Sequence, residues 1–307
     1  MNKIATRESF GKALEELGEE NDNVVVLDAD LYNSTKTEDF KKSFPNRFFN
    51  VGIAEADMIG TAAGLATCGK IPFASSFAAF ATGRVYDQIR ASIAYPNLNV
   101  KICATHAGIT VGEDGATHQM VEDINLMRGL PNMLVLSTSD DVQTKWAVKE
   151  IAKYEGPVYL RLTRYKTPTI YTKDSEFKIG KGVQIGDGTD ATVIATGVTV
   201  SEAVQAMRDL KEKNINIRVV DIHTIKPIDR ELIIKSAKET KKIITVEDHN
   251  IIGGLGSAVC EVLAEEYPVK VTRMGIKDTF GRSGKAESLM KYYQIDKEAI
   301  KAEIENN

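Results

Sequence analysis

The sequence predicts an α/β protein with two domains, each a mostly parallel β-sheet flanked by helices. Short apolar strands alternate with helices along most of the chain, which is typical of parallel sheets covered on both faces. A stretch rich in glycine, proline and charge at 165–190 interrupts this alternation. The length of 307 residues allows two separate cores. We therefore predict domains at 1–168 and 189–307, joined by a linker at 169–188 with a short hairpin.

The first half of the chain contains six predicted strands and five predicted helices. The strands are short apolar runs, many of them β-branched. They lie at 23–30, 47–53, 71–77, 99–108, 132–138 and 157–164. The helices are amphipathic or rich in small residues, and Thr6 is the expected N-terminal cap of the first. They lie at 6–20, 54–69, 83–95, 119–130 and 139–156.

The second half repeats the same alternation without repeating the sequence. Its predicted strands are again apolar runs bounded by polar residues or glycine. They lie at 191–197, 216–223, 242–249 and 269–276. Helices are predicted between and after these strands, near 200–213, 229–239, 254–267, 283–293 and 296–305. This pattern predicts a second, smaller parallel sheet.

Composition excludes several classes of function. The net charge of −4 argues against non-specific binding to nucleic acid or to a membrane surface. The three cysteines, Cys68, Cys103 and Cys260, are odd in number and widely spaced, which gives no disulfide or zinc pattern. The N-terminus lacks the apolar core of a secretion signal, and no apolar run approaches ~20 residues. We expect a cytoplasmic protein.

The loop Gly112–Gln119 has the sequence GEDGATHQ and is the strongest candidate for a functional site. It combines two acids, an imidazole, a hydroxyl and an amide with two glycines. His106 lies just upstream, so two of the four histidines of the chain fall in this region. Loops with this composition are typical of binding and proton transfer. The residues alone leave open a solvated surface turn.

Other polar residues follow different predicted strands at the same edge of the first sheet. Asp28 and Asp30 end one strand, Glu55 follows the next, and Arg164 ends the last. Ligands of open parallel sheets bind beyond the carboxyl ends of the strands. This shared edge supports a site more strongly than any single cluster does.

The segment THAGITVGEDGATHQ, together with NVGIAEADMIGTAAGLA and RGLPN, resembles transketolases. These enzymes use thiamine diphosphate to move two-carbon ketol units between sugar phosphates. The resemblance covers essentially the whole chain, but only the C-terminal half of a single-chain transketolase. It implies a pyrimidine-binding domain followed by the transketolase C-terminal domain.

The resemblance further implies the smaller subunit of a split transketolase. The partner would be an N-terminal subunit that binds the diphosphate and its metal, Mg²⁺ or Ca²⁺, so no metal ligand is expected on this chain. Two copies of each subunit would form a heterotetramer that acts in the pentose phosphate pathway.

For the cofactor, the resemblance assigns Glu55 to the thiamine pyrimidine as the activating carboxyl, and Phe77 and Phe80 to stacking on that ring. Without the resemblance, Glu55 is better explained as a first-turn acid facing the helix dipole, and aromatic residues at the entrance of a helix are usually part of the core. Many transketolases have a further aromatic residue where this chain has Gly83. Tyr86 is an alternative source of that wall.

The resemblance also assigns six substrate contacts. The residues that match them are Arg7, Ser34, His106, Asp114, His118 and Arg164. Four of these, Arg7, Ser34, His106 and Arg164, would hold the phosphate and nearby hydroxyls, and a guanidinium can grip phosphate bidentately. Asp114 would contact a hydroxyl beside the reacting carbon, and His118 would act catalytically on the sugar carbonyl or hydroxyl. Asp30 matches without a definite role, and Gln119 receives none.

Several motif-like patterns are expected to be coincidental. The triplet Gly186-Asp187-Gly188 with Asn214 imitates the motif that binds the metal and diphosphate, but it lies in predicted turns rather than at a strand's carboxyl edge. The glycines at 253–256 lack the spacing of a dinucleotide loop. His223 and His249 are expected to be packing or interface residues.

Three alternatives stay open. Deoxyxylulose-phosphate synthase has a similar layout, although His106 and the short length argue against it. The β subunit of a 2-oxoacid dehydrogenase is disfavoured by the Gly112–Gln119 loop and by Arg7 and Arg164. A catalytically silent regulatory subunit would not need Glu55 or His118.

Overall fold

The first sheet of the computed structural model, which describes residues 3–306, has seven strands in the order β12-β6-β7-β5-β4-β2-β3. Six of them come from the first half of the chain and pair in parallel. They are β2 (Val24–Asp28), β3 (Phe48–Asn50), β4 (Ile71–Phe77), β5 (Lys101–Thr105), β6 (Leu134–Ser137) and β7 (Val158–Arg161). All residues of β2, β5, β6 and β7 are buried, because helices and loops cover both faces.

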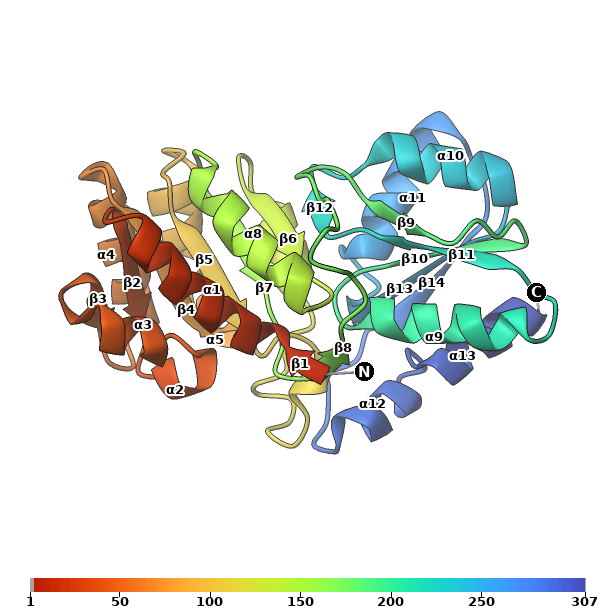
Figure 1. Ribbon diagram of the computed structural model, residues 1–307, viewed down its shortest axis with the longest axis horizontal. Coiled ribbons are helices and arrows are strands. Elements are labelled where there is room, and N and C mark those ends of the chain that lie inside the picture. Colours follow the sequence, from red (N-terminus) through yellow and green to blue (C-terminus); the bar gives the residue numbers. More distant parts are fainter. Residues whose placement is uncertain (1–2, 307) are drawn as a thin grey trace.

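Helices and short turns connect these strands. The longer helices are α1 (Thr6–Glu20), α4 (Glu55–Thr67) and α8 (Asp141–Lys153). The shorter ones are α2 (Tyr32–Thr35), α3 (Glu38–Ser43), α5 (Ala78–Ala81), α6 (Tyr86–Gln88) and α7 (Asp123–Arg128). Helices α1 and α8 lie side by side over one face of the sheet (Figure 1).

The second sheet has five strands in the order β14-β13-β10-β11-β9. Its strands are β9 (Val183–Ile185), β10 (Ala191–Ala195), β11 (Ile217–Asp221), β13 (Ile243–Asn250) and β14 (Val271–Ile276). All pair in parallel except β9, which is antiparallel to β11. The helices that follow are α9 (Thr199–Lys211), α10 (Arg230–Thr240), α11 (Leu255–Glu266), α12 (Ala286–Tyr292) and α13 (Lys297–Asn306). Figure 1 shows α10 and α11 on one side of this sheet and α9 and α13 on the other.

The two halves are bound together by a strand that crosses between them. Strand β12 (Thr224–Lys226) comes from the second half, yet it pairs antiparallel with β6 at the edge of the first sheet. One apolar cluster contains residues of both halves, including Met127, Val220 and Leu255. The second half therefore packs firmly against the edge of the first sheet. The predicted boundaries at 168 and 188 stay predictions.

Two local predictions were wrong. The linker forms no hairpin of its own, because β8 (Lys166–Pro168) pairs with β1 (Lys3–Ala5), and β9 pairs with β11. Thr6 is inside α1 rather than its cap. Its hydroxyl oxygen instead accepts a hydrogen bond from the backbone N–H of Thr163 at 2.8 Å, which ties the helix to the end of β7.

The predicted helices at 83–95 and 119–130 also differ from the structure. The first is a chain of a 3₁₀ turn, one α-turn and a π-helical segment (Ile89–Ala94). Such irregular segments are common near functional sites. The predicted helix at 119–130 is shortened to α7, because Gln119 belongs to the Gly112–Gln119 loop and the helix begins only at Asp123. Within residues 3–306, no helix has the length and apolar character needed to cross a bilayer.

Candidate functional site

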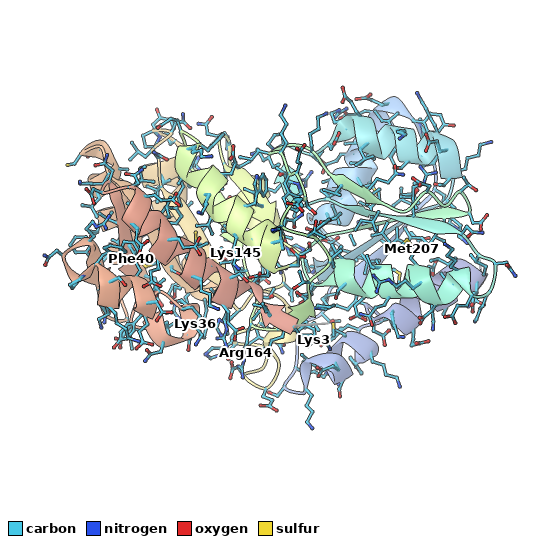
Figure 2. All side chains as sticks on the ribbon, viewed as in Figure 1. Lys3, Lys36, Phe40, Lys145, Arg164 and Met207 are labelled. Carbon is cyan, nitrogen blue, oxygen red and sulfur yellow. The ribbon has the colours of Figure 1, made fainter. Side chains whose placement is uncertain are left out.

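The carboxyl edge of the first sheet brings the candidate residues together. Because the strands from β2 to β7 are parallel, their carboxyl ends lie on one side. Phe77 ends β4, His106 follows β5, and Arg164 lies just beyond β7. Figure 2 labels Arg164 and Lys36 along this edge. The shared edge expected from the sequence is therefore present.

Glu55 is the first residue of α4, and its side chain is only 4% exposed. Its Oε1 accepts a hydrogen bond from Nη1 of Arg84 at 2.9 Å. The guanidinium of Arg84 also lies over the ring of Phe80, 4.2 Å from the ring centroid. A buried carboxylate requires a partner, and here Arg84 is the cation that provides it.

Aromatic and imidazole rings form a cluster beside this carboxyl. The rings of Phe77 and Phe80 are stacked with centroids 5.9 Å apart. The ring of His106 stacks on that of Phe77, with centroids 3.7 Å apart. His118 approaches Phe80 edge-on at 5.4 Å. Residues from three separate segments thus build a wall suited to a flat ring.

His106 has a left-handed backbone with φ of 58°, which is costly for a residue other than glycine. The buried imidazole contacts the ring of Phe77 and the guanidinium of Arg7. Burial, together with the charges of Arg7 and Arg164, lowers the pKa of His106 to about 3. The ring is therefore neutral at pH 7.

Neutrality fixes how His106 bonds to its neighbours. Nη1 of Arg7 lies 3.1 Å from Nε2 of His106, and a guanidinium can only donate. Nε2 is therefore the acceptor, and we assign the ring proton to Nδ1, which lies 2.8 Å from the hydroxyl of Thr105. Nη1 of Arg7 also donates to the carbonyl oxygen of Ser34 at 2.9 Å. His106 and Ser34 thus orient the Arg7 guanidinium.

Arg7 and Arg164 create a local positive field. Burial and the nearby charge of Arg164 lower the pKa of Arg7. Nε of Arg7 is buried without a hydrogen-bond partner in residues 3–306. Arg164 forms an ion pair of 3.0 Å with Asp114, and both side chains are 39% exposed. An unpaired donor beside two cations suits an anionic group such as a phosphate.

Residues of the second half of the chain hold the Gly112–Gln119 loop in place through hydrogen bonds. Asp248, at the carboxyl end of β13, accepts hydrogen bonds from the backbone N–H of Ile109 at 2.8 Å and from the hydroxyl of Thr110 at 2.6 Å. The side-chain amide of Gln119 donates to the carbonyl oxygens of Gly112 and Arg282, both at 2.9 Å. Gln119, which the sequence left without a role, therefore fixes the loop.

The approach between these elements explains Gly108. It has φ of +78°, and a Cβ added there would lie 2.1 Å from Oδ2 of Asp248. Only glycine allows both this backbone conformation and the close carboxyl. The loop that carries Asp114 and His118 is thus positioned by contacts across the domain junction.

Asp28 stabilises the segment that presents Ser34. Its carboxyl accepts hydrogen bonds from the backbone N–H of Leu31 and the hydroxyls of Thr35 and Thr37 at 2.6–3.0 Å. Burial raises the pKa of Asp28 to about 6. Asp30 instead exchanges two hydrogen bonds with Asn50 on β3. Both acids therefore have structural partners at this edge.

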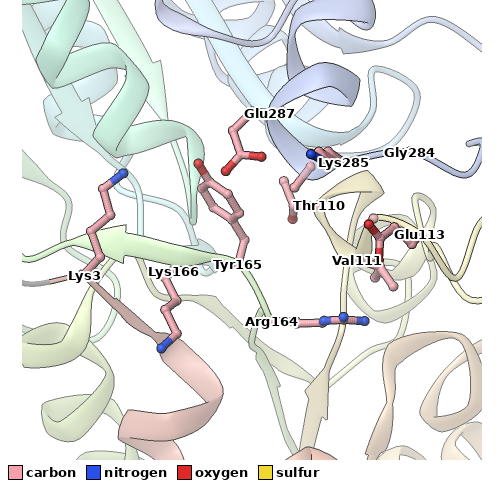
Figure 3. A pocket seen from close by; sticks show the side chains of 12 residues that line it. Lys3, Thr110, Val111, Glu113, Arg164, Tyr165, Lys166, Gly284, Lys285 and Glu287 are labelled. Atoms are coloured by element: carbon pink, nitrogen blue, oxygen red, sulfur yellow. The ribbon is translucent and has the colours of Figure 1, made fainter.

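A cavity of about 460 Å³ lies between the loop and the start of α12 (Figure 3). Figure 3 shows Arg164 and Glu113 on one side of it, and Lys285 and Glu287 on the other. Its lining includes neither Glu55 nor Phe77. The buried carboxyl and the stacked rings therefore lie outside this cavity, in the cluster around Glu55.

The patterns expected to be coincidental lie away from this edge. The triplet at 186–188 follows β9, and Asn214 follows α9. His223 packs against Trp146, and His249 is fully buried at the domain junction. Among residues 3–306, no group of three or more histidine, cysteine, aspartate or glutamate side chains is arranged to hold a metal.

Two residues of this region were missed by the sequence analysis. Arg84 stands alone between Gly83 and Val85, and no spacing rule links it to Glu55, which lies 29 positions earlier. Asp248 is 138 positions from Thr110. The only sequence feature that could have indicated Asp248 was its position at the end of a predicted strand of the second sheet. The sequence analysis assigned no function to the carboxyl edge of that sheet.

Two sequence models of one family match the chain: "Transketolase, pyrimidine binding domain" over residues 2–169 and "Transketolase, C-terminal domain" over residues 180–300. A Methanocaldococcus jannaschii protein described as a transketolase C-terminal section is 56% identical over 301 residues, 97% of this chain and 94% of that protein. Human transketolase is 42% identical over 303 residues, 97% of this chain but 48% of the human protein. The chain thus spans about half the length of the human enzyme.

A solved structure agrees with these matches. It is described as a split gene transketolase, inactive beta4 tetramer, and superposes with a TM-score of 0.92 at 51% identity over 99% of this chain and 98% of that one. The chain belongs to the transketolase family and corresponds to the C-terminal section of a split transketolase.

Proposed function

We propose that this chain, together with an N-terminal partner subunit, transfers a two-carbon ketol unit from a ketose phosphate to an aldose phosphate with the help of thiamine diphosphate. Both family models and the relatives reported above are transketolases. They favour ketol transfer over deoxyxylulose-phosphate synthesis and over a 2-oxoacid dehydrogenase subunit.

The observation that carries this proposal is a buried carboxyl beside two stacked aromatic rings. Glu55 offers a carboxyl oxygen, and Phe77 and Phe80 offer apolar faces. These groups fit a flat heterocycle with a ring nitrogen, such as the thiamine pyrimidine. When bound, the cofactor supplies a carbon nucleophile for the sugar carbonyl. Glu55 would hydrogen-bond to the ring nitrogen and favour the form of the neighbouring amino group that acts as a base.

The remaining residues would bind and orient the sugar phosphate. Arg7, with its unpaired Nε, and Arg164 would hold the phosphate, and neutral His106 would keep Arg7 in place. Asp114 would exchange its ion pair with Arg164 for a sugar hydroxyl. His118, fixed by a contact of 2.9 Å between its Nδ1 and the Thr117 hydroxyl, would move a proton at the substrate oxygen.

The diphosphate and its Mg²⁺ or Ca²⁺ would be bound by the N-terminal partner. A solved relative is described as an inactive tetramer of β chains, which supports the expectation that this chain turns over only with that partner. We expect a heterotetramer of two subunits of each kind in the cytoplasm. A silent regulatory subunit is the alternative.

Reconstitution tests this proposal. The purified chain alone should show no ketol transfer, and adding an N-terminal subunit that carries a diphosphate- and metal-binding segment should restore turnover of a ketose phosphate with an aldose phosphate. Glu55→Gln in the same mixture separates the alternatives. If Glu55 is catalytic, the substitution should abolish turnover. If the chain is a silent subunit, turnover should stay unchanged. Full activity of the isolated chain would exclude the split-enzyme proposal.

A further inference from the structure

Arg84 contacts two residues of the proposed cofactor site. Its Nη1 lies 2.9 Å from Oε1 of Glu55, and its guanidinium carbon lies 4.2 Å from the ring centroid of Phe80. One side chain thus takes both the carboxyl edge and an aromatic face. The guanidinium is planar, donates to carboxylates and stacks on rings, so it fills the place of a flat, hydrogen-bonding heterocycle.

We propose that Arg84 is a gate that competes with the thiamine pyrimidine for Glu55 and Phe80. This inference rests on the proposed function. Arg84 occupies Oε1 of Glu55 and one face of Phe80. A pyrimidine that binds this oxygen and this face would have to displace the guanidinium. Cofactor binding therefore requires the Arg84 side chain to leave Glu55.

The surroundings of Arg84 allow this movement. Its side chain is 49% exposed, whereas that of Glu55 is 4% exposed, so the arginine can swing towards solvent while the carboxyl stays in place. Arg84 lies in the 3₁₀ turn at 83–85, followed by a short α-turn and a π-helical segment. Gly83 beside it has open space, because an added Cβ would meet only Cε of Met120 at 3.6 Å.

The strength of the gate follows from its contacts. An ion pair with one half-exposed partner and a single cation–π contact are each weak. Together they should reduce cofactor affinity by about fivefold to tenfold. This is enough to keep Glu55 paired in the isolated chain, yet weak enough for the cofactor to displace Arg84 when the partner contributes its diphosphate contacts.

Equilibrium binding tests the gate without relying on activity. Calorimetric titration of thiamine diphosphate into the chain mixed with its N-terminal partner should give an affinity about five to ten times higher for Arg84→Gln than for the unmodified chain. Arg90→Gln is the matched control, since Arg90 is an exposed arginine of the same irregular segment. It should leave the affinity unchanged. Titration of the isolated chain with thiamine, which lacks the diphosphate, should show the same order of affinities.

The outcomes separate this inference from the proposed function. Tighter binding by Arg84→Gln, but not by Arg90→Gln, supports the gate. Unchanged or weaker binding by Arg84→Gln overturns it, because an arginine that merely supports the fold or contacts the cofactor gives that result. If no variant binds thiamine diphosphate even with the partner, the proposed function itself fails, and the gate fails with it.

Discussion

Replacing Asp248 with alanine should loosen the Gly112–Gln119 loop before it unfolds the protein. The carboxyl of Asp248 is buried at the domain junction and holds the turn at Ile109–Val111 from which the loop begins. It accepts hydrogen bonds from the backbone N–H and the hydroxyl of Thr110, and from the backbone N–H of Ile109. Alanine would leave these donors buried without an acceptor.

The size of the effect follows from those bonds. Each buried donor left without an acceptor costs about 1–3 kcal/mol. The buried carboxylate is itself costly, since burial raises the pKa of Asp248, and this offsets part of the loss. We expect the free energy of local opening to fall by about 3 kcal/mol. That corresponds to amide exchange roughly a hundredfold faster at Ile109 and Thr110.

Native-state hydrogen exchange, resolved to single amides, measures this directly. Asp229→Ala is a suitable control, because Asp229 caps α10 by accepting from the backbone N–H of Leu232 at 3.2 Å. It should cost about 1 kcal/mol of global stability without changing exchange in the loop. Unchanged protection of Ile109 and Thr110 in Asp248→Ala would refute the idea that the second half of the chain positions this loop.

Three further substitutions test the junction. Asp123→Asn should lower the free energy of unfolding by about 3–5 kcal/mol in urea titrations, since it leaves fully buried Arg161 without its partner at 2.7 Å; a loss below ~1 kcal/mol would contradict a buried pair. Burial raises the pKa of Asp221 from 3.8 to about 6, so the folded state binds the Asp221 proton more tightly than the unfolded state does. The stability that this proton contributes is fully present below pH ~4 and is lost as the pH rises through ~6. Asp221→Asn should therefore remove a decline of about 2–3 kcal/mol between pH 4 and 7, and identical pH profiles would argue against it. Gly108→Ala should lower the melting temperature by several degrees, or about 2 kcal/mol, because its Cβ would meet the carboxyl of Asp248; an unchanged melting temperature would show that the turn can shift.

The sequence predicted the alternation of strands and helices well, because buried parallel strands and amphipathic helices have distinct local patterns. Strand β4 begins and ends where the apolar run 71–77 indicated. The failures concern pairing between distant segments. Nothing local indicates that Thr224–Lys226 joins the first sheet, that β8 just before the linker pairs with β1, or that β9 within the linker pairs with β11.

The candidate site was only partly predictable for the same reason. Strand ends indicated one shared edge, and the family resemblance assigned roles to the residues there. The contacts among those residues required the structure. His106 binds Arg7, Asp114 binds Arg164, and Glu55 is covered by Arg84. Each contact joins residues at least 29 positions apart, so no periodicity or spacing carried the information.

We propose that this chain carries the half of the site that activates the thiamine pyrimidine through Glu55. Exchange of the C2 proton of thiamine diphosphate with deuterium oxide, followed by NMR in the assembled two-subunit enzyme, measures that activation without any sugar present. We expect Glu55→Gln to slow this exchange by about a hundredfold or more at saturating cofactor. Equal exchange rates in the two proteins would exclude this role for Glu55.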